Sequence, residues 1–136
     1  TNPNSPQGPL NKIASGGELA RFMLALKVNL AQSSHIGTMI FDEVDAGVGG
    51  ATAQAVGERL SRLAQNVQVL VVTHSPQVAA KGNHHYKVEK HCVNNVTTTT
   101  VKELDESSRH EEIARMLAGE TISDEARAAA KVLINK

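Results

Sequence analysis

Residues 37–43 have the sequence Gly-Thr-Met-Ile-Phe-Asp-Glu, an uncharged and mostly apolar segment that ends in two adjacent carboxylates. The apolar residues predict a short buried strand, and the glycine-rich run after Glu43 predicts a loop. In open parallel sheets, ligands bind at the carboxyl ends of the strands. The segment therefore places Asp42 and Glu43 where a ligand would bind. The alternative interpretation is that these two residues only end a strand and begin a turn.

A second predicted strand covers residues 67–73, Val-Gln-Val-Leu-Val-Val-Thr, which are nearly all apolar. Such a continuous run is typical of parallel strands that are buried on both faces. Residues 51–66, between the strands, carry apolar side chains at helical spacing. This order predicts a right-handed crossover unit, and hence an α/β fold with a mostly parallel sheet flanked by helices. His74 directly follows the second strand and is expected at the same edge as the carboxylates.

The flanking segments complete the predicted organisation. Residues 1–9 are rich in Pro, Asn and Gly and predict a linker or loop. A chain that opens in this way without Met is expected to be cut from a longer protein. Residues 10–136 then form one domain. Residues 84–104 predict a β-hairpin with its turn at 92–95, and a helix capped by Ser108 and a last helix follow.

Another helix is predicted to start at Ser15, because Ser15 and Glu18 have the spacing of a capping box. It should run to about Gln32. The first N–H groups of a helix are unpaired and its dipole is positive there, so this end suits an anion. Gly16 and Gly17 would let a ligand approach the backbone closely. The alternative is an ordinary helix cap.

Composition limits the class of protein. The chain has 136 residues, with 14 Lys and Arg against 14 Asp and Glu, a balance that argues against a dedicated nucleic-acid surface over this segment. Aromatic residues make up 2%, so the core must be aliphatic. The single cysteine, Cys92, cannot form an internal disulfide, which fits a reducing compartment. No apolar run is long enough to span a membrane and no signal peptide is evident, so a soluble cytoplasmic protein is predicted.

The predicted edge carries side chains suited to phosphate chemistry. The carboxylate of Asp42 suits Mg²⁺, which prefers oxygen ligands. Glu43 is placed to orient or deprotonate a water, and His74 would reach the same phosphate, unless it is only a turn residue. A zinc site among His84, His85, His91 and Cys92 is the weaker alternative to a solvated hairpin, because no Cys-x-x-Cys motif accompanies these residues.

These elements, in this order, resemble those of the ABC-type ATPases. Ala14-Ser15-Gly16-Gly17-Glu18 resembles their signature motif, and residues 39–43 resemble their Walker B strand with its catalytic Glu. Val44-Asp45-Ala46-Gly47 resembles their D-loop, and Thr73-His74 resembles their switch histidine, the H-loop. Three of these elements, the helix start at residues 15–18, the strand that ends in Asp42-Glu43 and the strand that ends in Thr73-His74, are far more specific together than any one alone. The resemblance implies a head lobe of the P-loop NTPase-like type.

Longer strings resemble the RecN family of bacterial DNA repair proteins. These strings are residues 13–21, 41–50, 72–80 and 112–119. The resemblance covers nearly the whole chain, from residue 1 to about residue 134. Members of this family commonly carry Leu where this chain has Ser75. The family is related to the structural-maintenance-of-chromosomes (SMC) proteins. The resemblance to this family implies an ATPase head that is split across the two ends of a longer chain, with a long antiparallel coiled coil between them.

One motif of that head is absent from the sequence. No Gly-x-x-x-x-Gly-Lys-Ser/Thr occurs, and the glycines of residues 47–50 lack the following Lys, so the phosphate-cradling Walker A loop is missing. In the family this loop belongs to the amino-terminal part. The resemblance therefore implies a carboxy-terminal head lobe that is inactive alone. Its implied partners are the amino-terminal part of the same protein, a second head in a homodimer, and DNA through the full-length protein. No membrane partner is implied, and the location would be the bacterial cytoplasm in association with the nucleoid.

The resemblance also implies residue roles in ATP hydrolysis during double-strand break repair. Asp42 would hold Mg²⁺, Glu43 and His74 would be catalytic, and Asp45 would couple two sites across the head interface. Residues that would contact, in trans, the ATP of a second head are Ser15, Gly16, Gly17 and Glu18. Two alternatives remain open: a head segment of another ABC-superfamily ATPase, and a non-catalytic dimerisation or docking module. Glu18 stands where transport ATPases usually have Gln.

Overall fold

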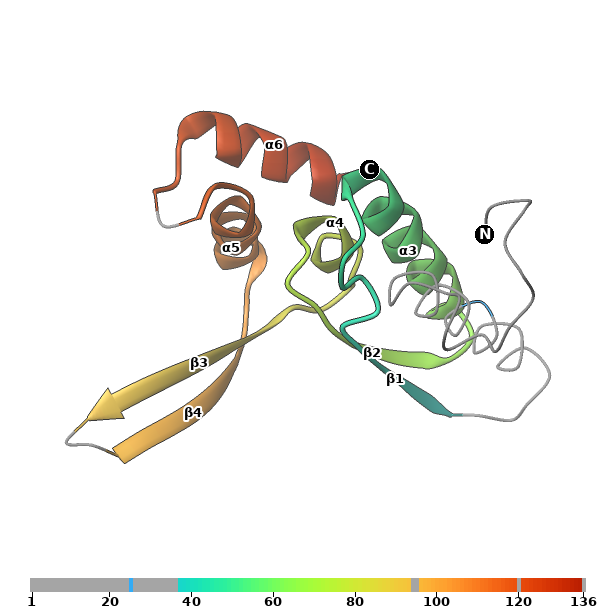
Figure 1. The fold of residues 1–136 in the computed structure, drawn as a ribbon, viewed down its shortest axis with the longest axis horizontal. Helices are drawn as coiled ribbons and strands as arrows, with labels where there is room; N and C mark the ends of the chain where they lie inside the picture. The colour runs from blue at the N-terminus through green and yellow to red at the C-terminus, as the bar shows by residue number, and fades with distance from the viewer. Residues whose placement is uncertain (1–24, 26–36, 94–95, 120, 136) are drawn as a thin grey trace, which may run out of the picture.

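The computed structural model describes residue 25 and residues 37–93, 96–119 and 121–135 (Figure 1). The elements follow the order β1 (Thr38–Asp42), α3 (Gly50–Leu63), β2 (Gln68–Val72), α4 (Pro76–Ala79), β3 (Tyr86–Val93), β4 (Val96–Glu103), α5 (Glu106–Ala118) and α6 (Asp124–Ile134). Ala25 is helical. The predicted linker at 1–9 and the rest of the helix predicted from Ser15 lie outside the described residues.

The strand–helix–strand unit predicted from the sequence is confirmed. β1 and β2 pair in parallel, from Thr38 opposite Gln68 to Asp42 opposite Val72, and α3 connects them. The described strands form two separate sheets of two strands each, however, and β3–β4 is antiparallel. The expectation of one mostly parallel sheet is therefore not confirmed in the part of the chain that the structure describes.

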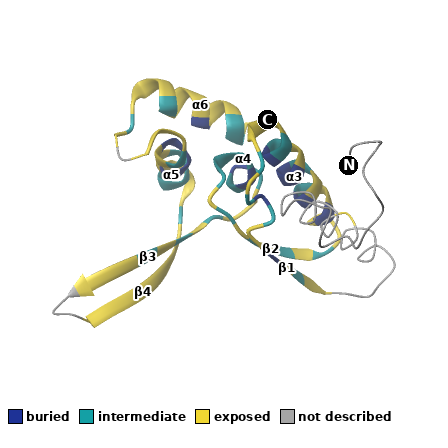
Figure 2. Ribbon diagram, viewed as in Figure 1, coloured by how far each residue is buried: buried dark blue, intermediate teal, exposed yellow. Residues whose placement is uncertain are grey.

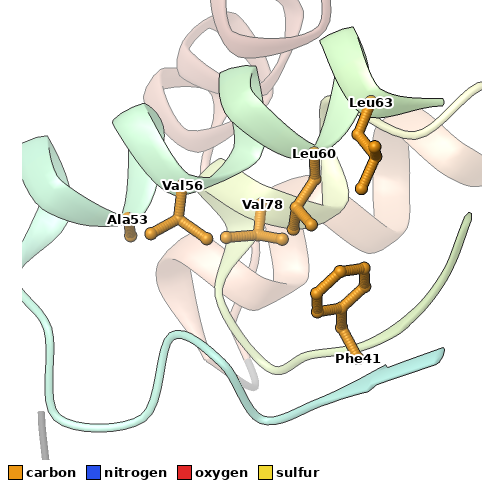
Figure 3. Close-up of a cluster of buried hydrophobic side chains, with 6 residues drawn as sticks. All are labelled: Phe41, Ala53, Val56, Leu60, Leu63 and Val78. Carbon is orange, nitrogen blue, oxygen red and sulfur yellow. The ribbon is translucent and has the colours of Figure 1, made fainter. Parts of the chain in front are cut away.

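A hydrophobic core lies between β1–β2 and the helices α3 and α4. Phe41 is fully buried and faces the apolar side chains of α3 and α4 (Figure 3). Met39, two residues earlier, packs against the same cluster, as expected because side chains of a strand alternate between faces. The buried residues of this cluster are Phe41, Ala53, Val56, Leu60, Leu63 and Val78.

The opposite face of the β1–β2 sheet is exposed. Ile40 is 66% exposed, Val72 is 57% exposed and Leu70 is 48% exposed. Because Ile40 pairs with Leu70, and Val72 with Asp42, these side chains form one apolar face with a carboxylate at its end. The apolar run of residues 67–73 predicted burial on both faces, and this prediction is wrong in the part of the chain that the structure describes, because Leu70 and Val72 are exposed. We call Ile40, Leu70 and Val72 the open sheet face.

A second core lies between α4, α5 and α6, and its buried residues are Ala80, Ile113, Ala114 and Ala130. α4 therefore joins the two cores, because Val78 belongs to the first, and Ala79 and the C-cap residue Ala80 contact the second. Arg109 holds the end of α4 in place: its Nη2 donates hydrogen bonds to the carbonyl oxygens of Ala80 and Gly82, at 2.9 and 2.5 Å.

Two sequence predictions about the second half need correction. β3 continues to Val93, which pairs with Val96, so Cys92 and Val93 belong to the strand and not to a turn at 92–95. A strand suits the β-branched Val93. The N-cap of α5 is Asp105, three residues before the predicted cap Ser108, and the Asp105 side chain accepts a hydrogen bond from the Ser108 backbone N–H at 2.7 Å. The hairpin β3–β4 extends away from the helices and is largely exposed (Figure 2).

Gly57 permits the close approach of α3 to α4. A Cβ at this position would lie 3.0 Å from the carbonyl oxygen of Gln77 and 3.2 Å from the Cα of Val78. We expect Gly57→Ala to destabilise the fold by about 1–3 kcal/mol, because backbone atoms must move to admit the methyl group. Urea unfolding measures this change. Gly37→Ala is the control, since a Cβ there meets no atom within 4 Å. A gain in stability, which helix propensity alone would give, would contradict the prediction.

Candidate functional site

The carboxyl ends of β1 and β2 bring three predicted site residues to one edge. Asp42 pairs with Val72, and the backbone N–H of Glu43 donates to the carbonyl oxygen of Val72 at 2.9 Å. His74 lies two residues beyond Val72. All three side chains are exposed. Among the described residues, none of the three side chains forms a hydrogen bond or ion pair, so each is available to a ligand at this edge.

Glu43 has a backbone conformation that the sequence did not predict. Its φ is 47°, in the left-handed region that residues other than glycine rarely adopt. Such a conformation costs on the order of 1–3 kcal/mol and persists only where surrounding contacts enforce it. Here the contacts are the bond from Glu43 N–H to Val72 and a turn in which the N–H of Ala46 donates to the Glu43 carbonyl at 3.0 Å. The strain marks the position where the chain leaves the sheet.

Asp45 lies inside the chain, with 3% of its surface exposed. Its Oδ2 accepts a hydrogen bond from the hydroxyl of Thr73, and its Oδ1 is buried without a partner among the described residues. The Thr73 hydroxyl oxygen also accepts from the backbone N–H of Ser75 at 2.9 Å. Within this chain, this geometry joins the two loops of one edge, and the coupling of two heads by Asp45 stays a prediction. Sequence reasoning gave Thr73 no separate role, because a bond between residues 45 and 73 depends on the strand register.

The other predicted nucleotide-contacting residues lie outside the described residues. These are Ser15, Gly16, Gly17 and Glu18, and their relation to the Asp42 edge remains a prediction. A magnesium ion is chemically compatible with the residues that are described. Mg²⁺ is usually held by one or two carboxylates together with substrate phosphates and water, and Asp42 offers an exposed carboxylate with no partner among the described side chains.

The histidines and the cysteine of the hairpin do not form a metal centre. In the described residues, no group of three or more His, Cys, Asp or Glu side chains is placed to hold a metal ion. His84 Nδ1 lies 3.0 Å from Glu103 Oε1, and His91 Nε2 lies 3.8 Å from Glu89 Oε2. Burial, followed by the charge of Arg109, lowers the pKa of His85, although Glu112 opposes this change.

A cavity of about 390 Å³ lies between the hairpin and α5, and none of the predicted site residues lines it. Two of the three basic side chains that line it are paired with one carboxylate: Lys87 Nζ lies 3.1 Å from Glu112, and Arg115 Nη2 lies 2.5 Å from Glu112. Burial acts to raise the pKa of Glu112, but hydrogen bonds from Arg115 and Lys87 outweigh it and hold that pKa below its usual range. The third basic side chain, Lys102, brings the lining to three basic against three acidic groups (Glu89, Glu111 and Glu112), so the cavity has no excess positive charge that would support a second anion site.

Comparison with known proteins decides the family. DNA repair protein RecN of Xylella fastidiosa (strain Temecula1) is 52% identical over 136 residues, which is 100% of this chain and 24% of that protein. RecN of Deinococcus radiodurans is 54% identical over 120 residues, which is 88% of this chain and 21% of that protein. The chain belongs to the RecN family. It matches the carboxy-terminal portion of these proteins and spans about a quarter of their length. No protein-family model matches the chain.

Solved structures give the same fold. A structure described under ATP-driven dimerization and DNA-stimulated activation of SMC ATPases has a TM-score of 0.64 at 19% identity, over 81% of this chain and 66% of that chain. The SMC head domain of Thermotoga maritima has a TM-score of 0.53 at 27% identity, over 68% of this chain and 35% of that chain. The α/β fold of an SMC head is therefore confirmed. Among the described residues, no helix is long and apolar enough to cross a lipid bilayer.

Proposed function

We propose that this chain is the carboxy-terminal lobe of a RecN ATPase head that hydrolyses ATP between two dimerised heads during DNA double-strand break repair. The observation that carries the proposal is the edge where Asp42, Glu43 and His74 lie at the ends of two paired strands with exposed side chains. The RecN relatives are named for DNA repair, and one structural neighbour is described in terms of ATP-driven dimerization. DNA would be engaged through the full-length protein, in the bacterial cytoplasm at the nucleoid.

The chemistry of this edge suits phosphoryl transfer to water. Asp42 would hold Mg²⁺, which neutralises charge on the phosphates when bound. The Glu43 carboxylate would orient the attacking water and accept its proton. His74 would donate a hydrogen bond to the γ-phosphate or to that water. Ser15, Gly16, Gly17 and Glu18 would contact the ATP of the opposite head, where an oriented helix start stabilises negative charge.

The open sheet face is the proposed docking surface for the amino-terminal part of the same protein. Three exposed apolar side chains from paired strands, Ile40, Leu70 and Val72, are unfavourable in water and favour a covered surface. About three quarters of the length of the RecN relatives lies outside this chain, so the covering part is available in the same polypeptide. That part would also supply the Walker A loop and additional parallel strands. A complete head would then have the mostly parallel sheet expected from the sequence.

Reconstitution from two parts tests the proposal. We expect this chain alone to show no ATP hydrolysis above background, because it has no phosphate-cradling loop. Mixing it with the amino-terminal part of RecN should give Mg²⁺-dependent hydrolysis, measured as phosphate release. The control is an amino-terminal part whose Walker A Lys is replaced by Ala, which should associate without turnover.

Two results would contradict the proposal. Turnover by this chain alone would refute the split site. Association of the two wild-type parts without turnover would instead favour the non-catalytic docking module.

A further inference from the structure

The hydroxyl of Thr73, the residue before His74, bonds both to Ser75, the residue after it, and to Asp45 in the other loop. The Thr73 hydroxyl donates to Asp45 Oδ2, and its oxygen accepts the backbone N–H of Ser75 at 2.9 Å. A hydroxyl has one donor hydrogen and two lone pairs, so both bonds can exist at once. His74 therefore lies inside a small hydrogen-bonded turn that the Thr73 side chain closes.

The same hydroxyl joins this turn to the loop that carries Glu43. Asp45 follows Glu43 by two residues, and its buried carboxylate accepts the Thr73 hydrogen bond. Next to it, Glu43 N–H donates to the Val72 carbonyl at 2.9 Å. Two hydrogen bonds therefore join the two loops: the backbone bond from Glu43 to Val72 and the side-chain bond from Thr73 to Asp45.

We propose that Thr73 is a positioning residue for ATP hydrolysis, whose hydroxyl fixes the loop of His74 against the loop of Glu43. This inference rests on the proposed function, since it requires Glu43 and His74 to act on the nucleotide. Loss of the hydroxyl removes the bonds to Asp45 and to Ser75. It also leaves both oxygens of the buried Asp45 carboxylate without a partner among the described residues. The two loops then lose their fixed separation while the nucleotide-binding Walker A part is unchanged.

The test uses the full-length RecN protein that contains this chain. Thr73→Val keeps the side-chain shape and removes the hydroxyl. We expect it to lower kcat about 10–100-fold, in line with the cost of small misplacements in active sites, while the KM for ATP changes less than about threefold. Thr73→Ser restores the hydroxyl and should recover most of the turnover. A role in stability alone would lower the unfolding temperature without this split between kcat and KM.

The matched control is Thr38→Val. Thr38 donates a hydroxyl hydrogen bond to Gln68 Oε1 at 2.8 Å, across the same two strands but at their opposite ends. We expect its kcat to stay within about twofold of the wild-type value. Thr73→Ala replaces Thr73→Val if the Val variant does not fold.

Two outcomes separate this inference from the proposed function. A Thr73→Val protein with wild-type kcat, beside a Glu43→Gln protein without hydrolysis, would overturn the positioning role alone. Wild-type hydrolysis by Glu43→Gln would overturn the proposed function, and the positioning role with it.

Discussion

Replacing Glu43 with Gln in the full-length protein is expected to stop ATP hydrolysis and to leave ATP bound between the heads. The amide keeps the size of the side chain and can still accept a hydrogen bond, but it cannot take a proton from water. General-base catalysis contributes about 10²–10⁴-fold to such reactions, so we expect a loss of at least about 100-fold in kcat. Phosphate release measures the loss, and retention of labelled ATP on a desalting column measures the trapped complex.

The position of Glu43 makes this expectation specific. Glu43 directly follows β1, whose last residue, Asp42, pairs with Val72. Its side chain is exposed and has no partner among the described residues. Glu106→Gln is the control, because Glu106 is also exposed but lies in the first turn of α5. It should leave kcat within about twofold. Hydrolysis by Glu43→Gln at the wild-type rate would show that Glu43 does not activate the water.

The sequence predicted the elements that carry the proposed site because their signals are local. The apolar runs of β1 and β2 and the helical spacing of α3 each depend on neighbouring residues. The order of the three elements then placed Asp42, Glu43 and His74 at one edge, which the pairing of β1 with β2 confirms. The roles of Ser15, Gly16, Gly17 and Glu18 stay predictions, since these residues lie outside those that the structure describes.

Features that depend on the folded arrangement were not predictable in the same way. The hydrogen bond from Thr73 to Asp45 joins residues 28 positions apart and has no periodic signature. The left-handed backbone of Glu43 arises from contacts with Val72 and Ala46 and not from a glycine in the sequence. At α5, Asp105 and Ser108 both fit the rules for a helix cap, and the structure selects Asp105.

Replacing Phe41 with Ala is expected to cost about 3–5 kcal/mol of folding stability, the usual range for a buried Phe. Phe41 is fully buried in the cluster between β1, α3 and α4. Domains of this size are stable by only about 5–15 kcal/mol, so the variant should be partly unfolded at 37 °C. Urea unfolding followed by circular dichroism measures the change on the 136-residue chain.

Ile40, the residue before Phe41 on the same strand, provides the control. Ile40 is 66% exposed, so Ile40→Ala should cost less than about 1 kcal/mol in this chain alone, since surface substitutions usually have small effects. A cost equal to that of Phe41→Ala would contradict the assignment of the two strand faces.

If the amino-terminal part covers the open sheet face, Ile40 becomes a core residue in the complete head. The same Ile40→Ala substitution should then cost about 2–4 kcal/mol, and it should weaken association of the two parts. Phe41→Ala, by contrast, should cost the same in both settings, because its surroundings are already complete within this chain.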